Sequence, residues 1–272
     1  MLLLLGSLPL LLMPGAARAG SSGLVLYLPL NEGSGSIAYD MSGEGNNGTI
    51  TGASWAAGKY GSALSFDGID DHVEIPSSID FDFYPSRDDG VSFSFCINTT
   101  DSNTRDILSR NCHSGLAFWL IRNIDGIIRI QIYDGTSQIE SDTTAPDIND
   151  GVWHHIAISV NFTTHYASMY VDGVEGSQAW WSSPIADMFD SAYSMELAKG
   201  TFSGGFLDAD IDEVRIFNRP LTSAEILNLY EFNELPPVEY AQRGEILAAA
   251  LVGALILVPM LIISVAAIRR RR

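Results

Sequence analysis

Residues 91–98 read Val-Ser-Phe-Ser-Phe-Cys-Ile-Asn, a regular alternation of large apolar side chains with small or polar ones. Successive side chains of a β-strand point to opposite faces, so this pattern predicts a strand with one face in a core. Similar alternation covers residues 116–121, 127–133, 152–160, 167–171 and 211–217.

Turn signals separate these segments. Asp-Gly, which tolerates positive φ and marks tight turns, occurs at residues 67–68, 89–90, 125–126, 134–135, 150–151 and 172–173. Many short strands without helical crossovers predict an all-β, antiparallel, two-sheet sandwich. A short helix is expected after it, because Thr222-Ser-Ala-Glu225 forms a capping box ahead of an apolar stripe.

Both ends of the chain are apolar. Residues 1–19 have a leucine-rich core and end in Ala17-Arg18-Ala19, which predicts a signal peptide, with an uncleaved N-terminal anchor as the alternative. Residues 246–268 carry no charge and would reach roughly 34 Å as a helix, enough to cross a bilayer core of about 30 Å. Arginines fill positions 269–272, and such clusters stay cytoplasmic.

These segments predict a single-pass protein of the cell membrane. The signal peptide (1–19) would export an extracellular domain (20–233), which a linker (234–245) joins to a transmembrane helix (246–268) and a basic cytoplasmic tail (269–272). The alternative is a C-terminal sorting signal that is cut and processed.

The charge of the chain excludes one class of partner. Asp and Glu number 33 against 15 Lys and Arg, which gives a net charge of −18. Binding to nucleic acid through phosphates needs a basic surface, so nucleic-acid partners are excluded.

Five motifs follow one another from residue 24 to residue 230. They are residues 24–43 (LVLYLPLNEGSGSIAYDMSG), 63–75 (ALSFDGIDDHVEI), 151–157 (GVWHHIA), 170–173 (YVDG) and 211–226 (IDEVRIFNRPLTSAEI). In this order they resemble the laminin-G-like, concanavalin-A-like jelly roll. The resemblance implies a jelly-roll fold, and structural calcium is common in that family.

Catalysis by a jelly-roll glycosidase would require a pair of carboxylates across one sugar. The nearest string, Glu140-Ser141-Asp142-Thr143-Thr144-Ala145, lacks the second glutamate of the Glu-x-Asp-x-(x)-Glu pattern. We therefore expect a protein that is not an enzyme.

Calcium is the metal that the carboxylates would suit. Asp67, Asp70 and Asp71 form an acidic turn of oxygen ligands. Asp212 lies two and four residues before Val214 and Ile216 on a predicted strand, so it would face the core together with them. A buried carboxylate must be paired or bind a cation. The alternatives are a solvated turn and an Asp212 that bonds backbone N–H groups or an arginine.

Aromatic side chains are the candidate ligand-binding residues, because sugar rings stack on them. Trp180 and Trp181 are adjacent and would point in opposite directions, so one of them can reach solvent. Tyr133 and Tyr166 are further candidates, and the alternative is that both tryptophans pack inside the sandwich.

Two cysteines and three sequons complete the candidates. Residues 91–98 and 107–110 are expected to pair as sequential strands, so a disulfide between Cys96 and Cys112 is predicted, with two free, partly buried thiols as the alternative. Asn47, Asn98 and Asn161 each begin an Asn-x-Thr glycosylation triplet.

Together these features predict a membrane-anchored module that binds an extracellular glycan or glycoprotein without catalysis. A protein–protein adhesion or envelope component is the second expectation, and a glycoside hydrolase is the third.

Overall fold

The computed structural model describes residues 23–86, 88–112, 117–143, 147–188, 193–200 and 205–234, except for the side chain of Cys112. The predicted signal peptide, transmembrane helix and basic tail, and all of the linker except Glu234, lie outside these residues.

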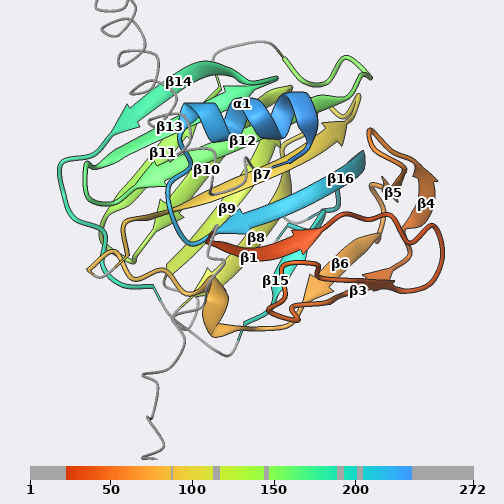
Figure 1. The fold of residues 1–272 in the computed structure, drawn as a ribbon, viewed down its shortest axis with the longest axis horizontal. Helices are drawn as coiled ribbons and strands as arrows, with labels where there is room; N and C mark the ends of the chain where they lie inside the picture. Colours follow the sequence, from red (N-terminus) through yellow and green to blue (C-terminus); the bar gives the residue numbers. More distant parts are fainter. Residues whose placement is uncertain are drawn as a thin grey trace, which may run out of the picture.

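The described chain folds into two antiparallel sheets that face each other, which confirms the predicted sandwich (Figure 1). In spatial order, the first sheet contains β14 (Val174–Trp180), β13 (Tyr166–Val171), β12 (His154–Asn161), β7 (Gly90–Asn98), β16 (Asp208–Phe217), β5 (Ser62–Asp67) and β4 (Ser54–Ala57), with β1 (Leu24–Leu28) also paired to β16. The second contains β11 (Gln138–Asp142), β10 (Ile127–Tyr133), β9 (Ala117–Ile124), β8 (Arg105–Cys112), β15 (Met195–Leu197), β6 (His72–Ile75), β3 (Gly48–Thr51) and β2 (Ile37–Ala38). A short 3₁₀ helix, η1 (Ile79–Phe81), follows β6.

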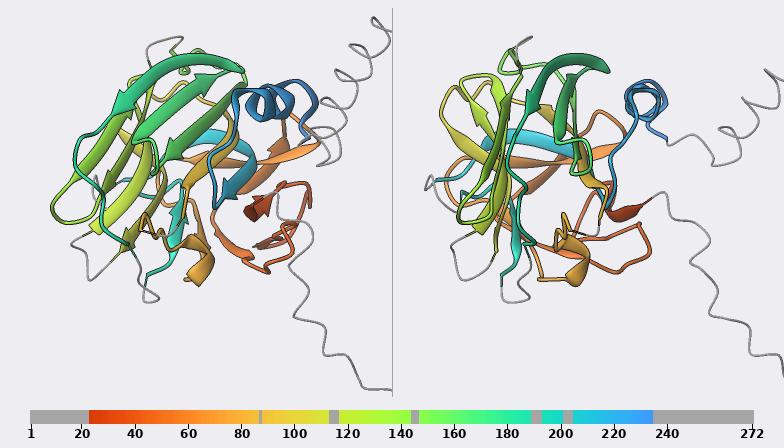
Figure 2. Two further views of the ribbon diagram at one scale, coloured as in Figure 1. Left: turned by 60° about the vertical axis from the view of Figure 1, so that its left-hand side comes forward. Right: turned by 90° about the vertical axis from the view of Figure 1, so that its left-hand side faces the viewer.

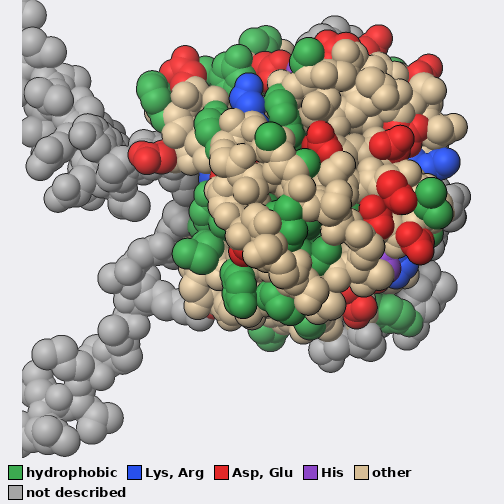
Figure 3. Space-filling model, turned by 90° about the vertical axis from the view of Figure 1, so that its right-hand side faces the viewer, with side chains coloured by type: hydrophobic (Ala, Val, Ile, Leu, Met, Phe, Trp, Pro, Cys, Tyr) green, Lys and Arg blue, Asp and Glu red, His purple; other side chains and the backbone are tan. Residues whose placement is uncertain are grey.

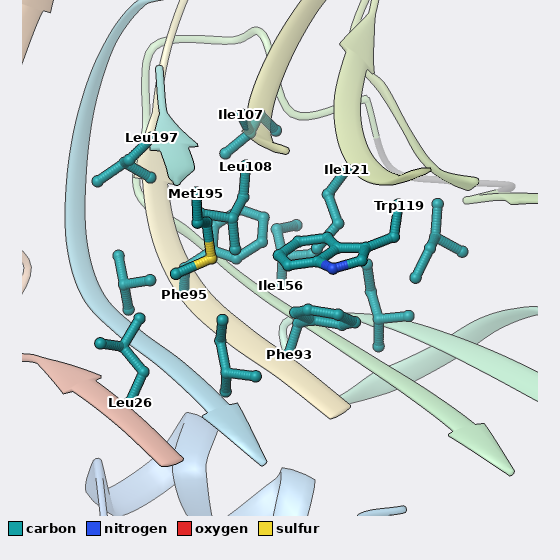
Figure 4. Close-up of a cluster of buried hydrophobic side chains, with 14 of the residues drawn as sticks. Leu26, Phe93, Phe95, Ile107, Leu108, Trp119, Ile121, Ile156, Met195 and Leu197 are labelled. Carbon is teal, nitrogen blue, oxygen red and sulfur yellow. The ribbon is translucent and has the colours of Figure 1, made fainter. Parts of the chain in front are cut away.

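The core lies between the two sheets and is rich in aromatic side chains (Figure 4). Trp119 of the second sheet is fully buried, and its ring lies 5.0 Å from Phe93 of the first sheet and 5.6 Å from Phe83. Phe93 belongs to the alternating segment that predicted the fold. The apolar half of that alternation therefore does face the core.

Two of the Asp-Gly pairs form the tight turns that the sequence predicts. Asp125 and Gly126 both have positive φ (51° and 87°) and join β9 to β10. Asp172 and Gly173 repeat this geometry (51° and 75°) between β13 and β14. Left-handed backbone at both central positions matches the twist of a two-residue hairpin, which is why Asp-Gly is favoured there.

Helix α1 (Ser223–Phe232) covers the outer face of the first sheet (Figure 2). The predicted capping box is present: Glu225 N–H donates to the Thr222 hydroxyl, and Thr222 N–H donates to the Glu225 carboxylate. Ile226 and Leu229 pack on Ala157, Tyr170 and Phe217, forming a second and smaller apolar cluster.

The expected pairing of residues 91–98 with residues 107–110 is wrong. The former lie in β7, between β12 and β16 of the first sheet, whereas the latter lie in β8, between β9 and β15 of the second. The short connection between β7 and β8 therefore crosses from one sheet to the other instead of closing a hairpin.

Candidate functional site

Trp180 and Tyr166 form an exposed aromatic pair at the edge of the first sheet. They are direct partners on β14 and β13, so their side chains share one face. Trp180 is 67% exposed and Tyr166 is 37% exposed. The Tyr166 hydroxyl donates to the side-chain oxygen of Gln178, which also lies on β14.

Trp180 lines two surface hollows. One, of about 360 Å³, is lined by Gln138, Glu140 and Trp180 among others. The other, of about 370 Å³, is lined by Thr136, Gln138, Trp180 and Ser183 among others. Both hollows lie where β14 of the first sheet meets β11 of the second. An exposed ring with amide, carboxylate and hydroxyl groups around it is the chemistry that binds a sugar ring.

The other two aromatic candidates are less exposed than Trp180. Trp181 lines both hollows as well. Trp181 is only 7% exposed and stacks on His165, with ring centroids 5.7 Å apart, so the packed alternative holds for this residue. Tyr133 is half-buried and contacts Phe118 at 5.5 Å on the second sheet. Tyr133 lines neither hollow, although Gln138, its partner in the ladder, lines both.

The line where β14 of the first sheet meets β11 of the second, here called the seam, has a polar network that the sequence did not reveal. Arg129 forms a two-point ion pair with Asp142, at 2.6 and 2.7 Å, and a further one with Glu140 at 3.0 Å. Gln131 also donates to Glu140 at 3.1 Å. The polar positions of both segments, Arg129 and Gln131 in one and Glu140 and Asp142 in the other, were the available signal, but only the cross-strand register reveals that they lie together.

The acidic turn does bring its carboxylates together. Asp67, Asp70 and Asp71 each place one oxygen within 4.8 Å of the others. Asp67 ends β5 and Asp71 precedes β6, so the turn joins the two sheets. Asp71 is almost fully buried, and this desolvation raises the pKa of its carboxyl above the usual value.

Acidic side chains are also spread over the surface at the end of the molecule where β4 and β5 lie (Figure 3). Three clustered carboxylates in this setting fit a hard divalent cation such as Ca²⁺, which takes oxygen ligands.

Asp212 does not face the core, so that expectation is wrong. The ladder between β16 and β7 shifts register between Asp212 and Arg215, and Glu213 has a positive φ of 59°. This β-bulge inverts the parity, so Val214 and Ile216 point into the core while Asp212 points outward beside Cys96. Asp212 is also separate from the acidic turn.

Asp212 is nonetheless fully buried. Tyr60 N–H donates to one carboxylate oxygen at 2.9 Å, and the other oxygen is buried without a hydrogen-bond partner. Burial raises the pKa of this carboxyl to about 7.

The predicted disulfide between Cys96 and Cys112 is wrong. Cys96 is a free, buried thiol on the outer side of the first sheet, whereas Cys112 ends β8 in the second sheet and its side chain lies outside the described residues. Cys96 lies in a row with Asp212 and His155 across β16, β7 and β12. Burial raises the pKa of the thiol to about 12 and lowers that of His155 to about 4.

The three sequons have different surroundings. Asn47 is exposed in the loop between β2 and β3, and its side-chain oxygen accepts from Asp40 N–H. Asn98 ends β7 and pairs with Asp210. Asn161 ends β12 and pairs with Tyr166.

The fold places the chain in a family. Residues 67–227, more than half of the chain, match the laminin-G-type model of the concanavalin A-like lectin/glucanases superfamily. The chain belongs to this superfamily. The match covers strands β6 to β16 and the first half of helix α1, and it confirms the resemblance seen in the sequence motifs.

Solved structures similar to this superfamily member share its fold at low sequence identity. The binding domain of Paraclostridial Mosquitocidal Protein 1 is 18% identical (TM-score 0.61) over 76% of this chain and 51% of that one. Domain 4 of AbnA, an extracellular arabinanase from Geobacillus stearothermophilus solved with arabinotriose, is 21% identical (TM-score 0.58) over 76% of this chain and 98% of that domain. The binding domain of botulinum neurotoxin serotype G is 17% identical (TM-score 0.59) over 77% and 51%.

This superfamily member spans about half the length of the toxin binding domains. No curated protein matches its sequence. Among the helices in the described part of the chain, none has the length and apolar character needed to cross a membrane.

Proposed function

We propose that this protein is a non-catalytic recognition module that binds an extracellular glycan or glycoprotein. The observation that carries the proposal is Trp180, an indole ring that is two-thirds exposed and lines two hollows together with polar side chains. An exposed ring on which a sugar can stack, with hydrogen-bonding groups beside it, is the arrangement that a glycan site requires.

The structural neighbours support a binding role. One is a domain of an arabinanase solved with arabinotriose, and two are toxin binding domains. At these identities the fold alone is shared, so they support the class of function and not a particular ligand.

The charges at the seam favour an uncharged ligand. Glu140 lines one hollow, and the cation nearest to it, Arg129, is committed to Glu140 and Asp142. A sulfated or carboxylated glycan would meet a carboxylate there. Neutral sugars avoid this repulsion and still offer hydroxyl donors to Glu140 and Gln138.

Two groups of residues that could suggest catalysis are unsuited to it. Glu140 and Asp142, the carboxylates of the glycosidase-like string, are both ion-paired to Arg129. The row of Cys96, His155 and Asp212 is buried, and a thiol whose pKa is raised to about 12 is not a nucleophile at neutral pH. Both observations support binding without catalysis.

The proposal places the module on the cell surface, exported by residues 1–19 and held by residues 246–268. It also assigns a structural Ca²⁺ to Asp67, Asp70 and Asp71, whose oxygens already lie close together. The ion would offset the repulsion among three carboxylates.

The experiment that tests the function is a glycan array probed with the full chain and with Trp180→Ala, both produced in a host that attaches no N-linked glycans. We expect neutral glycans among the ligands of the full chain. Trp180→Ala should bind them more weakly by roughly tenfold or more, because truncating a central aromatic residue costs about 2 kcal/mol. Tyr39→Ala, which removes an exposed aromatic ring far along the sequence in the β2–β3 loop, is the matched control and should bind normally.

Glycan binding that survives Trp180→Ala would place the ligand elsewhere. Silence of a folded sample on the whole array would contradict glycan recognition and favour protein adhesion. One observation favours that second class: β14 is an edge strand of the described first sheet, with Val174 and Trp180 exposed, and such an edge can pair with another chain.

A further inference from the structure

Three side chains form a row across three neighbouring strands of the first sheet. Asn161 of β12 pairs with Tyr166 of β13, and Tyr166 pairs with Trp180 of β14. Direct partners in an antiparallel ladder point to the same face, with Cβ atoms about 5 Å apart. Asn161 therefore lies beside the aromatic pair, on the same outer face.

Asn161 is also placed to accept a glycan. It begins the triplet Asn161-Phe162-Thr163 at the turn between β12 and β13, and Thr163 is exposed. Thr164 N–H donates to the side-chain oxygen of Asn161 at 2.7 Å. That bond orients the side-chain amide through its oxygen. The amide nitrogen, through which N-linked glycans are attached, is not used by this bond.

We propose that Asn161 carries an N-linked glycan that packs on Tyr166 and covers Trp180, so that modification of Asn161 closes the ligand surface. This inference rests on the proposed function, because it concerns access to the same aromatic pair. The first sugar would lie next to the Tyr166 ring, its nearest cross-strand neighbour, where sugar C–H groups can pack against the aromatic face.

The distances allow the same glycan to reach Trp180. Neighbouring strands lie about 4.8 Å apart, so Trp180 is roughly 10 Å from Asn161 along the row. A branched N-linked core is several sugar rings long and spans such a distance. A glycan tethered at this position is present at high effective concentration and would outcompete a free neutral sugar of similar affinity.

The test compares the full chain, produced in a secretory host that attaches N-linked glycans, with Thr163→Ala, which destroys the acceptor triplet and keeps Asn161. Asn47→Gln removes a sequon in the β2–β3 loop and is the matched control. Glycopeptide mass spectrometry reports whether Asn161 is modified. Quenching of tryptophan fluorescence by acrylamide, with Trp180→Phe as a reference, reports the accessibility of Trp180 without any ligand.

We expect Asn161 to be modified and the glycosylated chain to lack the part of the acrylamide quenching that comes from Trp180. This quenching should return in Thr163→Ala and after enzymatic removal of the glycans. It should not return in Asn47→Gln. An unmodified Asn161, or a modified one that leaves quenching unchanged, would overturn the inference.

A glycan array then separates this inference from the proposed function. If the glycan shields Trp180 but Thr163→Ala binds nothing on the array, the glycan lies where we infer it, and the proposed function fails because the surface that it covers binds no sugar. If Thr163→Ala and the modified chain bind glycans equally, the inference fails and the function stands.

Discussion

Asp212 illustrates how the position of one residue in a ladder sets its chemistry. The bulge at Glu213 turns Asp212 away from the core and under the segment that contains Tyr60, whose N–H is its hydrogen-bond donor. The carboxyl is buried with one oxygen unpartnered, and burial raises its pKa to about 7. The folded state therefore binds a proton more tightly than the unfolded state, where an aspartate has an ordinary pKa of about 3.9.

Asp212→Asn should remove a pH-dependent loss of stability. The wild-type free energy of unfolding is expected to fall as pH rises from about 4 to 7, with the full penalty present above 7, because the folded state must then hold a buried charge. At pH 8 the variant should be more stable by roughly 1–3 kcal/mol, and the gain should vanish near pH 4. Urea unfolding at both pH values measures this, with the exposed Asp208→Asn as control; an equal gain at both pH values would contradict the assignment.

Helix α1 is held to the first sheet at both of its ends. At its start, the Thr222–Glu225 capping box is reinforced by Arg219, which donates to the Glu225 carboxylate at 2.6 and 3.0 Å. At its end, Asn233 adopts a left-handed conformation, and its side-chain oxygen accepts from Arg215 at 2.9 Å. Tyr230 of the helix also lies beside His155, with ring centroids 6.0 Å apart, so the helix reaches the row that contains Cys96 and Asp212.

Thr222→Ala should loosen this helix. Loss of an N-cap hydroxyl costs about 1 kcal/mol, which for a domain of this size lowers the melting temperature by roughly 2–4 °C. Differential scanning calorimetry measures the shift. Glu231→Ala, an exposed change in the last turn, is the control, and a Thr222→Ala melting temperature equal to that of this control would show that the cap carries no stability.

At the scale of the whole molecule, the acidic turn connects the two sheets. A cation bound to Asp67, Asp70 and Asp71 would tie the end of β5 to the start of β6, so its binding energy would stabilise the sandwich as a unit. A ligand that binds only the folded state raises stability by about 2.7 kcal/mol at a hundredfold excess over Kd.

Ca²⁺ should therefore raise the melting temperature, and EDTA should reverse the rise. Asp70→Asn replaces an exposed member of the cluster and should abolish the response, whereas the exposed Asp125→Asn should keep it. Thermal unfolding with and without Ca²⁺ is the measurement. A melting temperature that Ca²⁺ leaves unchanged in the wild type would contradict the metal assignment.

The sequence by itself determined six of the strands (β7, β9, β10, β12, β13 and β16) and α1, because alternation and capping are local signals: Phe93 and Phe95 point into the core as predicted, and Thr222 caps the helix. It also indicated that one of the adjacent Trp180 and Trp181 can reach solvent, with both packed inside as the alternative. It could not decide which one, since both faces of an edge strand look alike in sequence.

The tertiary structure decided how these elements pair. It placed Cys96 and Cys112 in different sheets, moved Asp212 out of the core through a bulge, and joined β14 to β11 at the seam around Trp180. Strand pairing and bulges depend on partners distant along the chain, whereas alternation reports only whether one face of a segment is buried.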